Sequence, residues 1–480
     1  MSVNAHNPVM MDIQQAACVL GAEWSGGNPF FNSVSTDSRT LRTGSLFVAL
    51  SGAHFDGHRF IPEAIDKGAV AAMISDEAAD LEKKLVSPDF AWLRVKNPRL
   101  SLGQLAAAWR KRFDLTLVAV TGSNGKTTVK EMLAAILRQH AGACHTLATA
   151  GNLNNDIGVP LTLLQLNADH RYAVIEMGMN HSGEIACLSS LAAPTIAVIT
   201  NAGSAHMAHL GETAAIAAAK GEIFAGMDKS GIAVINADDR YAPLWRQLAG
   251  ERQIVDFGLT HDASVSARRL QDAAGNGWLL SLPDGQIEFM LQVPGQHNIY
   301  NALAAAAAAH AAGIGITEIA AGLRSYTGTH GRLQIMAGQC HSTMIDDTYN
   351  ANPESMQAAI AVLCDMCGKK ILVMGDMGEL GVAAAEYHRQ IGHLAREAKL
   401  DALLALGELS AHAVEAFGRN GQHFAHLDDL LASLTKLLDT NVTVLVKGSR
   451  AMRMERIIEK LSTAQESTNR NTAMRGRNEH

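Results

Sequence analysis

The sequence has few aromatic residues and no block of like charge. Phe, Tyr and Trp make up 5% of the 480 residues while Ala and Gly are abundant, which favours α/β layers with close helix–sheet packing. Lys and Arg do not cluster and the net charge is −7, so we expect no nucleic-acid partner. No apolar run reaches the roughly 18 residues of a membrane span, and the N-terminal residues lack a basic-then-apolar signal pattern. We therefore expect no membrane insertion.

The cysteines form neither a disulfide framework nor a zinc pattern. The one CxxC pair, Cys364 and Cys367, lacks the second pair that a zinc site usually needs. Reduced thiols are typical of a cytoplasmic protein, and we expect that location.

A chain of this length is too long for one hydrophobic core, and its pattern predicts three α/β domains. Residues 1–97 contain short strand-like pieces and form the expected N-terminal domain. The central domain is expected at 98–328 and a third, Rossmann-like domain at 329–462. Residues 463–480 are polar, and we expect this tail to be disordered.

The central segment alternates apolar runs with helical spacing. Leu115–Val120 is a continuous apolar run, as in a parallel strand buried on both faces. Similar runs follow at Tyr172–Met177, Thr195–Thr200 and Gly231–Asn236. This alternation predicts a doubly wound, mostly parallel sheet.

A phosphate-binding loop is predicted between the first of these strands and a helix. The sequence there is Thr121-Gly-Ser-Asn-Gly-Lys-Thr-Thr128. Gly122, Ser123, Asn124 and Gly125 would turn backbone N–H groups towards phosphate oxygens, together with those of the helix N-terminus up to Thr128. Lys126 would reach the β- and γ-phosphates, and the Thr127 hydroxyl would bind Mg²⁺. Val120 replaces the first Gly of the full GxxxxGK[ST] pattern, which makes this the shorter form of the loop.

Polar residues near the strand ends could complete a phosphate-transfer site. Glu176 closes a predicted buried strand, where it could hold hydrated Mg²⁺; an ion pair is the alternative. His206 lies in the loop after another strand and could ligate a second Mg²⁺, or be a solvated loop residue. Lys220 lies in an otherwise apolar helix, where a lysine usually extends its amine to solvent.

Two asparagines and an arginine occur further along the chain. Asn298 and Asn301 are spaced i, i+3 at the start of an Ala-rich helix, so their amides share a face and could read adenine edges or cap the helix. Arg332 stands at the expected boundary of the last two domains, from which an arginine could reach the γ-phosphate only on domain closure.

Taken together, the motifs resemble those of the Mur ligase family. The resemblance spans nearly the whole chain up to about residue 462. It rests on TDSR (36–39), TGSNGKTT (121–128), GNLNNDIGVPLTLL (151–164), EMGMNHSGEI (176–185), AKGEIF (219–224), GQHNIYNALAAA (295–306), GRLQ (331–334), DDTYNANPESM (346–356), MGDMGELG (374–381) and LVKGSR (445–450).

The resemblance implies an ATP-dependent amide ligase that forms an acyl phosphate. NNDIGVP and DDTYNANP favour the member that joins D-alanyl-D-alanine to UDP-MurNAc-tripeptide, giving UDP-MurNAc-pentapeptide for peptidoglycan. It also implies UDP-binding, ATP-binding and Rossmann-like domains, two Mg²⁺ ions and a carbamylated Lys220 helping to hold the second ion. We expect a monomer.

Further residue roles come only from the resemblance. It places Asn298, Asn301 and Asp346 at adenine and ribose, and Arg332 at the phosphates. The remaining expected substrate contacts are Ser38, Arg39 and Phe47 for uridine, Asn154 and Asn155 for the muramoyl peptide, and Asn350 and Asn352 for the incoming dipeptide.

Several alternatives stay open at this point. A sister ligase would add a single amino acid; the DNPR motif of the diaminopimelate- or lysine-adding enzyme is absent, the only NPR being Asn97-Pro-Arg99. A P-loop hydrolase or switch would turn over ATP without an amine acceptor. The third residue of the tripeptide, meso-diaminopimelate or lysine, does not follow from the sequence.

Overall fold

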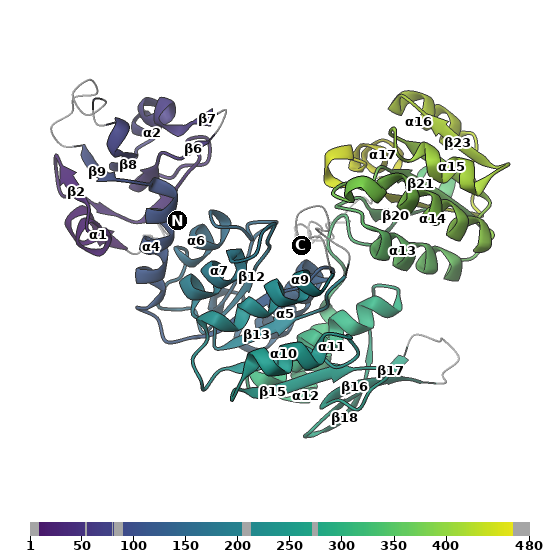
Figure 1. Cartoon of the computed structure of the whole chain (residues 1–480), viewed down its shortest axis with the longest axis horizontal. Coiled ribbons are helices and arrows are strands. Elements are labelled where there is room, and N and C mark those ends of the chain that lie inside the picture. The colour runs from purple at the N-terminus through teal and green to yellow at the C-terminus, as the bar shows by residue number, and fades with distance from the viewer. Residues whose placement is uncertain are drawn as a thin grey trace, which may run out of the picture. The chain divides into compact units, whose positions relative to one another are not determined.

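The computed structural model describes residues 9–52, 55–78, 80, 90–203, 213–270 and 277–463. Its contacts divide the chain into two compact units. One unit holds residues up to 292 together with 296–327, and the other holds 293–295 and the residues from Gly328 onward. The sheets confirm the α/β class: the first unit carries an N-terminal and a central sheet, and the second carries one more (Figure 1).

The N-terminal sheet has the order β2-β9-β8-β5-β4, and only the β2–β9 pair is antiparallel. Asp12 starts helix α1 because its side chain accepts the backbone N–H of Gln15, while Gln15 bonds back to Asp12. The elements of this part are β1 (Met11–Asp12), α1 (Ile13–Leu20), β2 (Glu23–Ser25), β3 (Phe30–Phe31), β4 (Ser33–Ser35), β5 (Ser45–Val48), β6 (Ser51–Gly52), β7 (Phe55–Asp56), α2 (Ile61–Asp66), β8 (Ala71–Ser75) and β9 (Ala91–Val95).

The central sheet has the order β11-β12-β10-β13-β14-β15-β16-β17-β18. It is parallel from β11 to β16, and its inner strands are apolar because helices cover both faces. Its strands are β10 (Thr116–Thr121), β11 (Thr146–Ala148), β12 (Tyr172–Glu176), β13 (Ile196–Ile199), β14 (Ile232–Asn236), β15 (Gln253–Gly258), β16 (Val265–Arg269), β17 (Gly277–Leu282) and β18 (Gly285–Met290).

The antiparallel β16–β18 extension of this sheet is a feature that the strand pattern did not predict. Of the described helices of the chain, none is both long and apolar enough to cross a bilayer; Ala-rich α11 is a buried helix of the central domain. The central helices are α4 (Pro98–Arg110), α5 (Lys126–Ala141), α6 (Gly158–Leu163), α7 (Glu184–Ala192), α9 (Thr213–Gly221), α10 (Ala242–Ala249), α11 (Gln296–Ala311) and α12 (Ile316–Ser325).

The second unit contains a sheet of order β19-β20-β24-β21-β22-β23, in which only the edge pair β19–β20 is antiparallel. The sequence predicts strands here at Thr343–Asp347, Ile371–Gly375, Ala402–Ala405 and Val442–Val446, and these are present as β20, β21, β22 and β24. The sequence interpretation missed β19 and β23. The elements are β19 (Gln334–Ala337), β20 (Thr343–Asp347), α13 (Pro353–Asp365), β21 (Lys369–Gly375), α14 (Ala384–Glu397), β22 (Ala402–Leu406), α15 (Ala411–Phe417), β23 (Gly421–Phe424), α16 (Leu427–Thr435), β24 (Val442–Lys447) and α17 (Glu455–Leu461).

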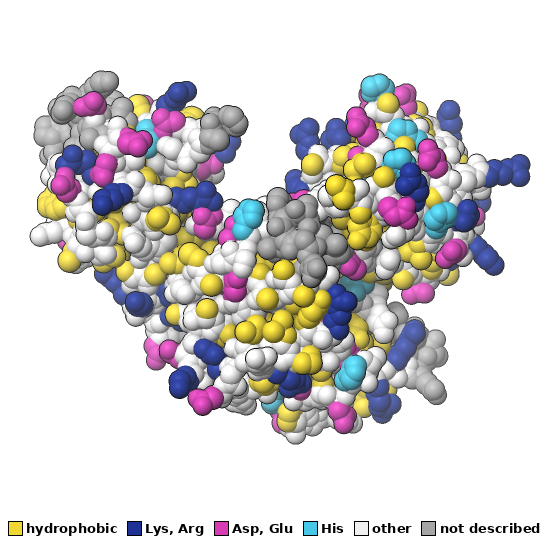
Figure 2. All heavy atoms as spheres, in the orientation of Figure 1, with side chains coloured by type: hydrophobic (Ala, Val, Ile, Leu, Met, Phe, Trp, Pro, Cys, Tyr) yellow, Lys and Arg dark blue, Asp and Glu magenta, His cyan; other side chains and the backbone are white. Residues whose placement is uncertain are grey.

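Charged side chains of both signs are interspersed on the face drawn in Figure 2. Lys and Arg side chains lie among Asp and Glu there, without a continuous cationic area. This agrees with the scattered charges of the sequence. The polar tail expected at 463–480 lies outside the described residues apart from Thr463.

Candidate active site

The phosphate loop connects β10 to α5, and two of its glycines are required by close neighbours. A Cβ on Gly122 would lie 1.8 Å from the Thr200 Oγ1 atom. A Cβ on Gly125 would lie 2.2 Å from Asn301 Oδ1, and Gly125 also has a φ of 81° at the start of α5. The loop is therefore packed between the end of β13 and helix α11.

The backbone N–H groups of the loop do not all face the same way. Those of Ser123 and Asn124 donate to the Asn201 backbone oxygen at 3.0 Å and to Asn201 Oδ1 at 2.9 Å. In this structure, these two of the amides predicted to face phosphate are therefore engaged by Asn201. Helix α5 begins at Lys126, and its first intrahelical bond comes from Val129 N. The N-terminus of α5 is thus the part of the loop region where backbone amides and the helix dipole together favour an anion.

The Lys126 side chain folds over the loop, where Nζ donates to the Gly122 oxygen at 2.7 Å and to the Ser123 oxygen at 3.2 Å. Thr127, the other residue predicted to serve the nucleotide and its metal, is buried in the first turn of α5. Lys126 and Thr127 therefore both lie in the first turn of α5, directly after the loop, as the loop motif predicts.

Glu176 ends β12 directly beside the strand that leads into the loop, in register with Val120. It is 1% exposed, and its Oε1 accepts the Asn154 Nδ2 hydrogen bond at 2.7 Å. Within the described part of the chain, nothing donates to the buried Oε2 atom, and the alternative of an ion pair is not observed. A buried carboxylate with one open oxygen suits a hard cation such as Mg²⁺. Asn154 thus orients this carboxylate, and its expected contact with the muramoyl peptide stays a prediction.

Lys220, in α9, is 1% exposed, so the expectation of an amine extended to solvent is wrong. Burial, and then the nearby positive charge of Lys126, lowers the pKa of Lys220 well below its usual range. A neutral amine is the form that reacts with CO₂. His206 lies outside the described residues.

No group of three or more His, Cys, Asp and Glu side chains that could hold a metal occurs among the described residues. A cation at this site would therefore depend on further ligand types, such as the Thr127 hydroxyl, a modified Lys220 or the phosphates of the nucleotide.

Asn298 and Asn301 are buried on one face of α11, as their spacing predicted, and Asn301 Nδ2 donates to Asn298 Oδ1 at 3.1 Å. The neighbouring Tyr300 hydroxyl donates to Asp238 Oδ2 at 2.9 Å. Burial, followed by this bond to Asp238, raises the pKa of Tyr300 to about 12. The sequence interpretation missed Asp238 and Asn201; each lies two residues after the end of a buried strand, which was the available signal.

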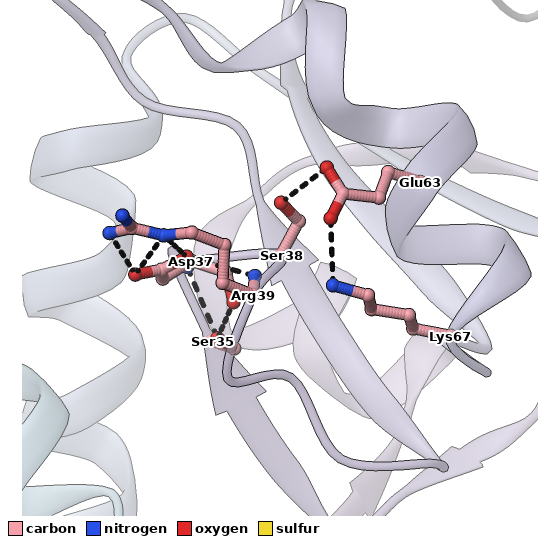
Figure 3. Close-up of polar contacts among 6 residues, drawn as sticks. All are labelled: Ser35, Asp37, Ser38, Arg39, Glu63 and Lys67. Atoms are coloured by element: carbon pink, nitrogen blue, oxygen red, sulfur yellow. Dashed lines mark hydrogen bonds and ion pairs between the residues drawn. The ribbon is translucent and has the colours of Figure 1, made fainter.

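In the N-terminal domain, Ser38 and Arg39 are already engaged by neighbours (Figure 3). Arg39 forms a forked ion pair with Asp37 that lowers the pKa of Asp37 to about 2. The Ser38 hydroxyl donates to Glu63 Oε2 at 3.0 Å. Phe47 is 1% exposed and packs in the core of this domain, and its expected uridine contact stays a prediction.

In the second unit, Arg332 closes a tight turn, with its N–H donating to the Thr329 oxygen at 3.0 Å. Its guanidinium carbon lies 4.1 Å from the centre of the Tyr349 ring. Asp346, expected at ribose, is 0% exposed and accepts the Gly331 N–H at 3.0 Å and the Thr348 hydroxyl at 2.6 Å. In this structure Asp346 therefore stabilises the turn that carries Arg332.

The dipeptide candidates lie in the loop between β20 and α13. Asn352 caps α13 by accepting the Ser355 N–H at 2.8 Å, and Asn350 Oδ1 accepts the next backbone N–H. The sequence interpretation assigned no role to Lys447, which ends β24. It forms a buried ion pair with Asp347 and donates to the Asn350 oxygen at 2.9 Å. This pair holds the loop against the sheet.

Comparisons with known proteins follow the same three parts of the chain. Family models match at residues 31–110 (Mur ligase family, catalytic domain), 120–309 (Mur ligase middle domain) and 331–450 (Mur ligase, glutamate ligase domain). A UDP-N-acetylmuramoyl-tripeptide–D-alanyl-D-alanine ligase of Escherichia coli (strain K12) is 41% identical, over 94% of this chain and 98% of the relative.

The chain belongs to the Mur ligase family. A ligase of the same name from Bacillus subtilis (strain 168) is 36% identical to this Mur ligase over 90% of the chain and 93% of the relative. The structure of MurF from Acinetobacter baumannii matches with a TM-score of 0.85 and 36% identity, over 94% of this chain and 98% of the other. MurF ligase from Thermotoga maritima in complex with ADP matches with a TM-score of 0.76 and 29% identity, over 89% and 96%. The predicted family and fold class are confirmed.

Proposed function

We propose that this Mur ligase uses ATP to join D-alanyl-D-alanine to UDP-MurNAc-tripeptide, forming UDP-MurNAc-pentapeptide for peptidoglycan synthesis. The substrates are those in the names of relatives that it matches over nearly their whole length. The structural observation that carries the proposal is the α5 N-terminus beside Glu176, whose buried carboxylate keeps one oxygen open. That arrangement suits a nucleotide phosphate and a cation together.

The nucleotide would bind along the loop and α11. The amides that begin α5 would hold the phosphates, and Lys126 would leave its loop oxygens for the β- and γ-phosphates. Asn298 and Asn301 would contact adenine. Gly122 and Gly125 would serve the site because, lacking a Cβ, they let the side chains of Thr200 and Asn301 approach the loop backbone.

For Mg²⁺, the ligands would be Thr127 and Glu176 at a first ion, and Glu176, His206 and a carbamylated Lys220 at a second. The open oxygen of Glu176 and the low pKa of Lys220 fit this assignment. In carbamylation, the neutral Lys220 amine forms an N–C bond to CO₂ and loses one proton, which leaves a carboxylate. When bound, magnesium would supply positive charge against the phosphate oxygens.

The reaction brings together two anions, the tripeptide carboxylate and the γ-phosphate. Lys126 would reduce their repulsion from the central domain, and Arg332 from the C-terminal domain once the domains close. Attack of the carboxylate would release ADP and give an acyl phosphate. The dipeptide amine would then attack that carbonyl, lose a proton and release inorganic phosphate.

The remaining substrate contacts follow the domain order. Ser38 and Arg39 would receive the uridine end in the domain at 1–97, and Asn155 the muramoyl peptide in the domain at 98–328. Asn350 and Asn352 would bind the incoming dipeptide in the domain at 329–462, at the carboxyl edge of the sheet, where open α/β sheets bind ligands. We propose that the enzyme acts in the cytoplasm as a monomer.

A phosphate-release assay tests the function. ATP, UDP-MurNAc-tripeptide and D-alanyl-D-alanine are supplied together, and each is omitted in turn. We expect release only with all three, and no release from the Lys126→Ala variant, whose fold is checked by circular dichroism. Release that ignores the dipeptide would support the hydrolase alternative, and release with single amino acids in its place would support a sister ligase.

A further inference from the structure

The Asn201 side chain holds Asn124 of the phosphate loop by both of its polar atoms. The residue follows β13, and its Oδ1 accepts the Asn124 N–H at 2.9 Å while its Nδ2 donates to the Asn124 oxygen at 3.1 Å. The Asn201 backbone oxygen accepts the Ser123 N–H at 3.0 Å. Three hydrogen bonds to one residue therefore set the orientation of three consecutive loop peptides, from Gly122–Ser123 to Asn124–Gly125.

Thr200 acts on the same part of the loop. Its hydroxyl donates to the Asn124 oxygen at 2.6 Å, so that this oxygen receives two hydrogen bonds. Thr200 is itself held from the next strand, because Asn236 Nδ2 donates to its backbone oxygen at 3.0 Å. The Thr200 hydroxyl also occupies the space that a Cβ on Gly122 would need. The end of β13 and the loop thus fit each other closely.

We propose that Thr200 and Asn201 are positioning residues that hold the phosphate loop in its nucleotide-binding conformation before the nucleotide arrives. By directing the Ser123 and Asn124 amides to β13, they let the chain turn at Gly125 and present the α5 N-terminus. A loop ordered in advance loses less conformational entropy on binding, which raises affinity. The inference rests on the proposed use of ATP at this loop.

The test compares ADP with adenosine, because adenosine lacks the groups that the loop binds. For Asn201→Ala we expect the Kd of ADP to rise about tenfold. The variant loses two side-chain hydrogen bonds, each with an effect of roughly three- to tenfold, and relaxation of the loop partly offsets this loss. The Kd of adenosine should change less than twofold. Under ligation conditions the KM for ATP should rise in the same proportion, with kcat within about twofold of the wild type.

Thr200 supplies a second, independent set of variants. Thr200→Val keeps the shape but removes the hydroxyl, and should raise the Kd of ADP about threefold. Thr200→Ser keeps the hydroxyl and should restore wild-type affinity. Thr195→Val is the matched control, because Thr195 lies at the opposite end of β13 and its hydroxyl bonds only Leu117 among the described residues. This control should leave ADP affinity unchanged.

The outcomes separate this inference from the proposed function. If the wild type binds ADP and ligates, but Asn201→Ala and Thr200→Val bind ADP as tightly as it does, the positioning role is wrong while the function stands. An equal loss of adenosine affinity would show general damage to the domain and would also overturn the inference. A wild type that binds no ADP would instead refute the proposed function.

Discussion

The open oxygen of Glu176 leads to an unusual prediction: Glu176→Gln should make the metal-free protein more stable while it abolishes ligation. The carboxylate is buried, and only Oε1 has a hydrogen-bond donor within the described part of the chain, from Asn154. Gln has the same shape and no charge. It can keep an oxygen towards Asn154 and place its amide in the open position, so the substitution removes a buried charge without leaving a cavity.

The magnitude follows from the cost of an unsatisfied buried group. Burying a carboxylate oxygen without a donor costs more than burying a neutral amide in the same place, so removal of the charge should raise the free energy of unfolding by about 1–3 kcal/mol. In a unit of this size, each kcal/mol of added stability raises the Tm by about 2 °C, so we expect the Tm to increase by about 2–6 °C. Excess Mg²⁺ and ADP should stabilise the wild type strongly and the variant much less, because the stability added by a ligand grows with the logarithm of its concentration relative to Kd.

Thermal unfolding followed by circular dichroism in EDTA, and again with Mg²⁺ and ADP, measures both effects. Glu222→Gln is the matched control. Its carboxylate accepts the Ser182 hydroxyl and the Gly183 and Ala186 N–H groups at the start of α7, so both oxygens are in use. That variant should lose about 0.3–1 kcal/mol. If Glu176→Gln is also destabilising in EDTA, the argument from an open oxygen is refuted.

Three further predictions follow. In CO₂-free buffer, the free energy of unfolding should rise with pH up to about 10.4, because folding lowers the pKa of Lys220 and the unfolded residue keeps its proton to a higher pH; denaturant titrations of Lys220→Met should lose this slope. Lys447→Met should destabilise its unit by about 3–5 kcal/mol in the same assay, because it leaves the buried Asp347 charge unpaired. Adding Asp347→Asn removes that charge and should recover most of the loss; a small loss in the single variant would show that the ion pair contributes little. Arg332→Ala should lower kcat about 10²- to 10³-fold with ATP affinity almost unchanged; Tyr349→Phe, which keeps the stacked ring, is its control, and an equal loss of ATP affinity would contradict the closure role.

Local patterns made much of the fold predictable. Continuous apolar runs identified β10, β12, β13 and β14 because a strand buried on both faces needs apolar residues at every position. The β16–β18 extension was missed because its burial is mixed, with Arg269 and Met290 exposed, so no continuous run marks it. The phosphate loop and the shared face of Asn298 and Asn301 were predictable because each depends on neighbours within a few residues.

The sequence by itself determined the α/β class, the loop and the order of motifs, all of which depend on short-range spacing. Only the tertiary structure decided which hydrogen-bond partner each polar group takes. Asn154 meets Glu176, Asn201 meets Asn124, and Asp346 meets the turn before Arg332. The physical reason is that a buried polar group forms a hydrogen bond with a group that tertiary packing brings to within about 3 Å, often from a distant segment. The spacing of residues along the sequence does not specify that distance.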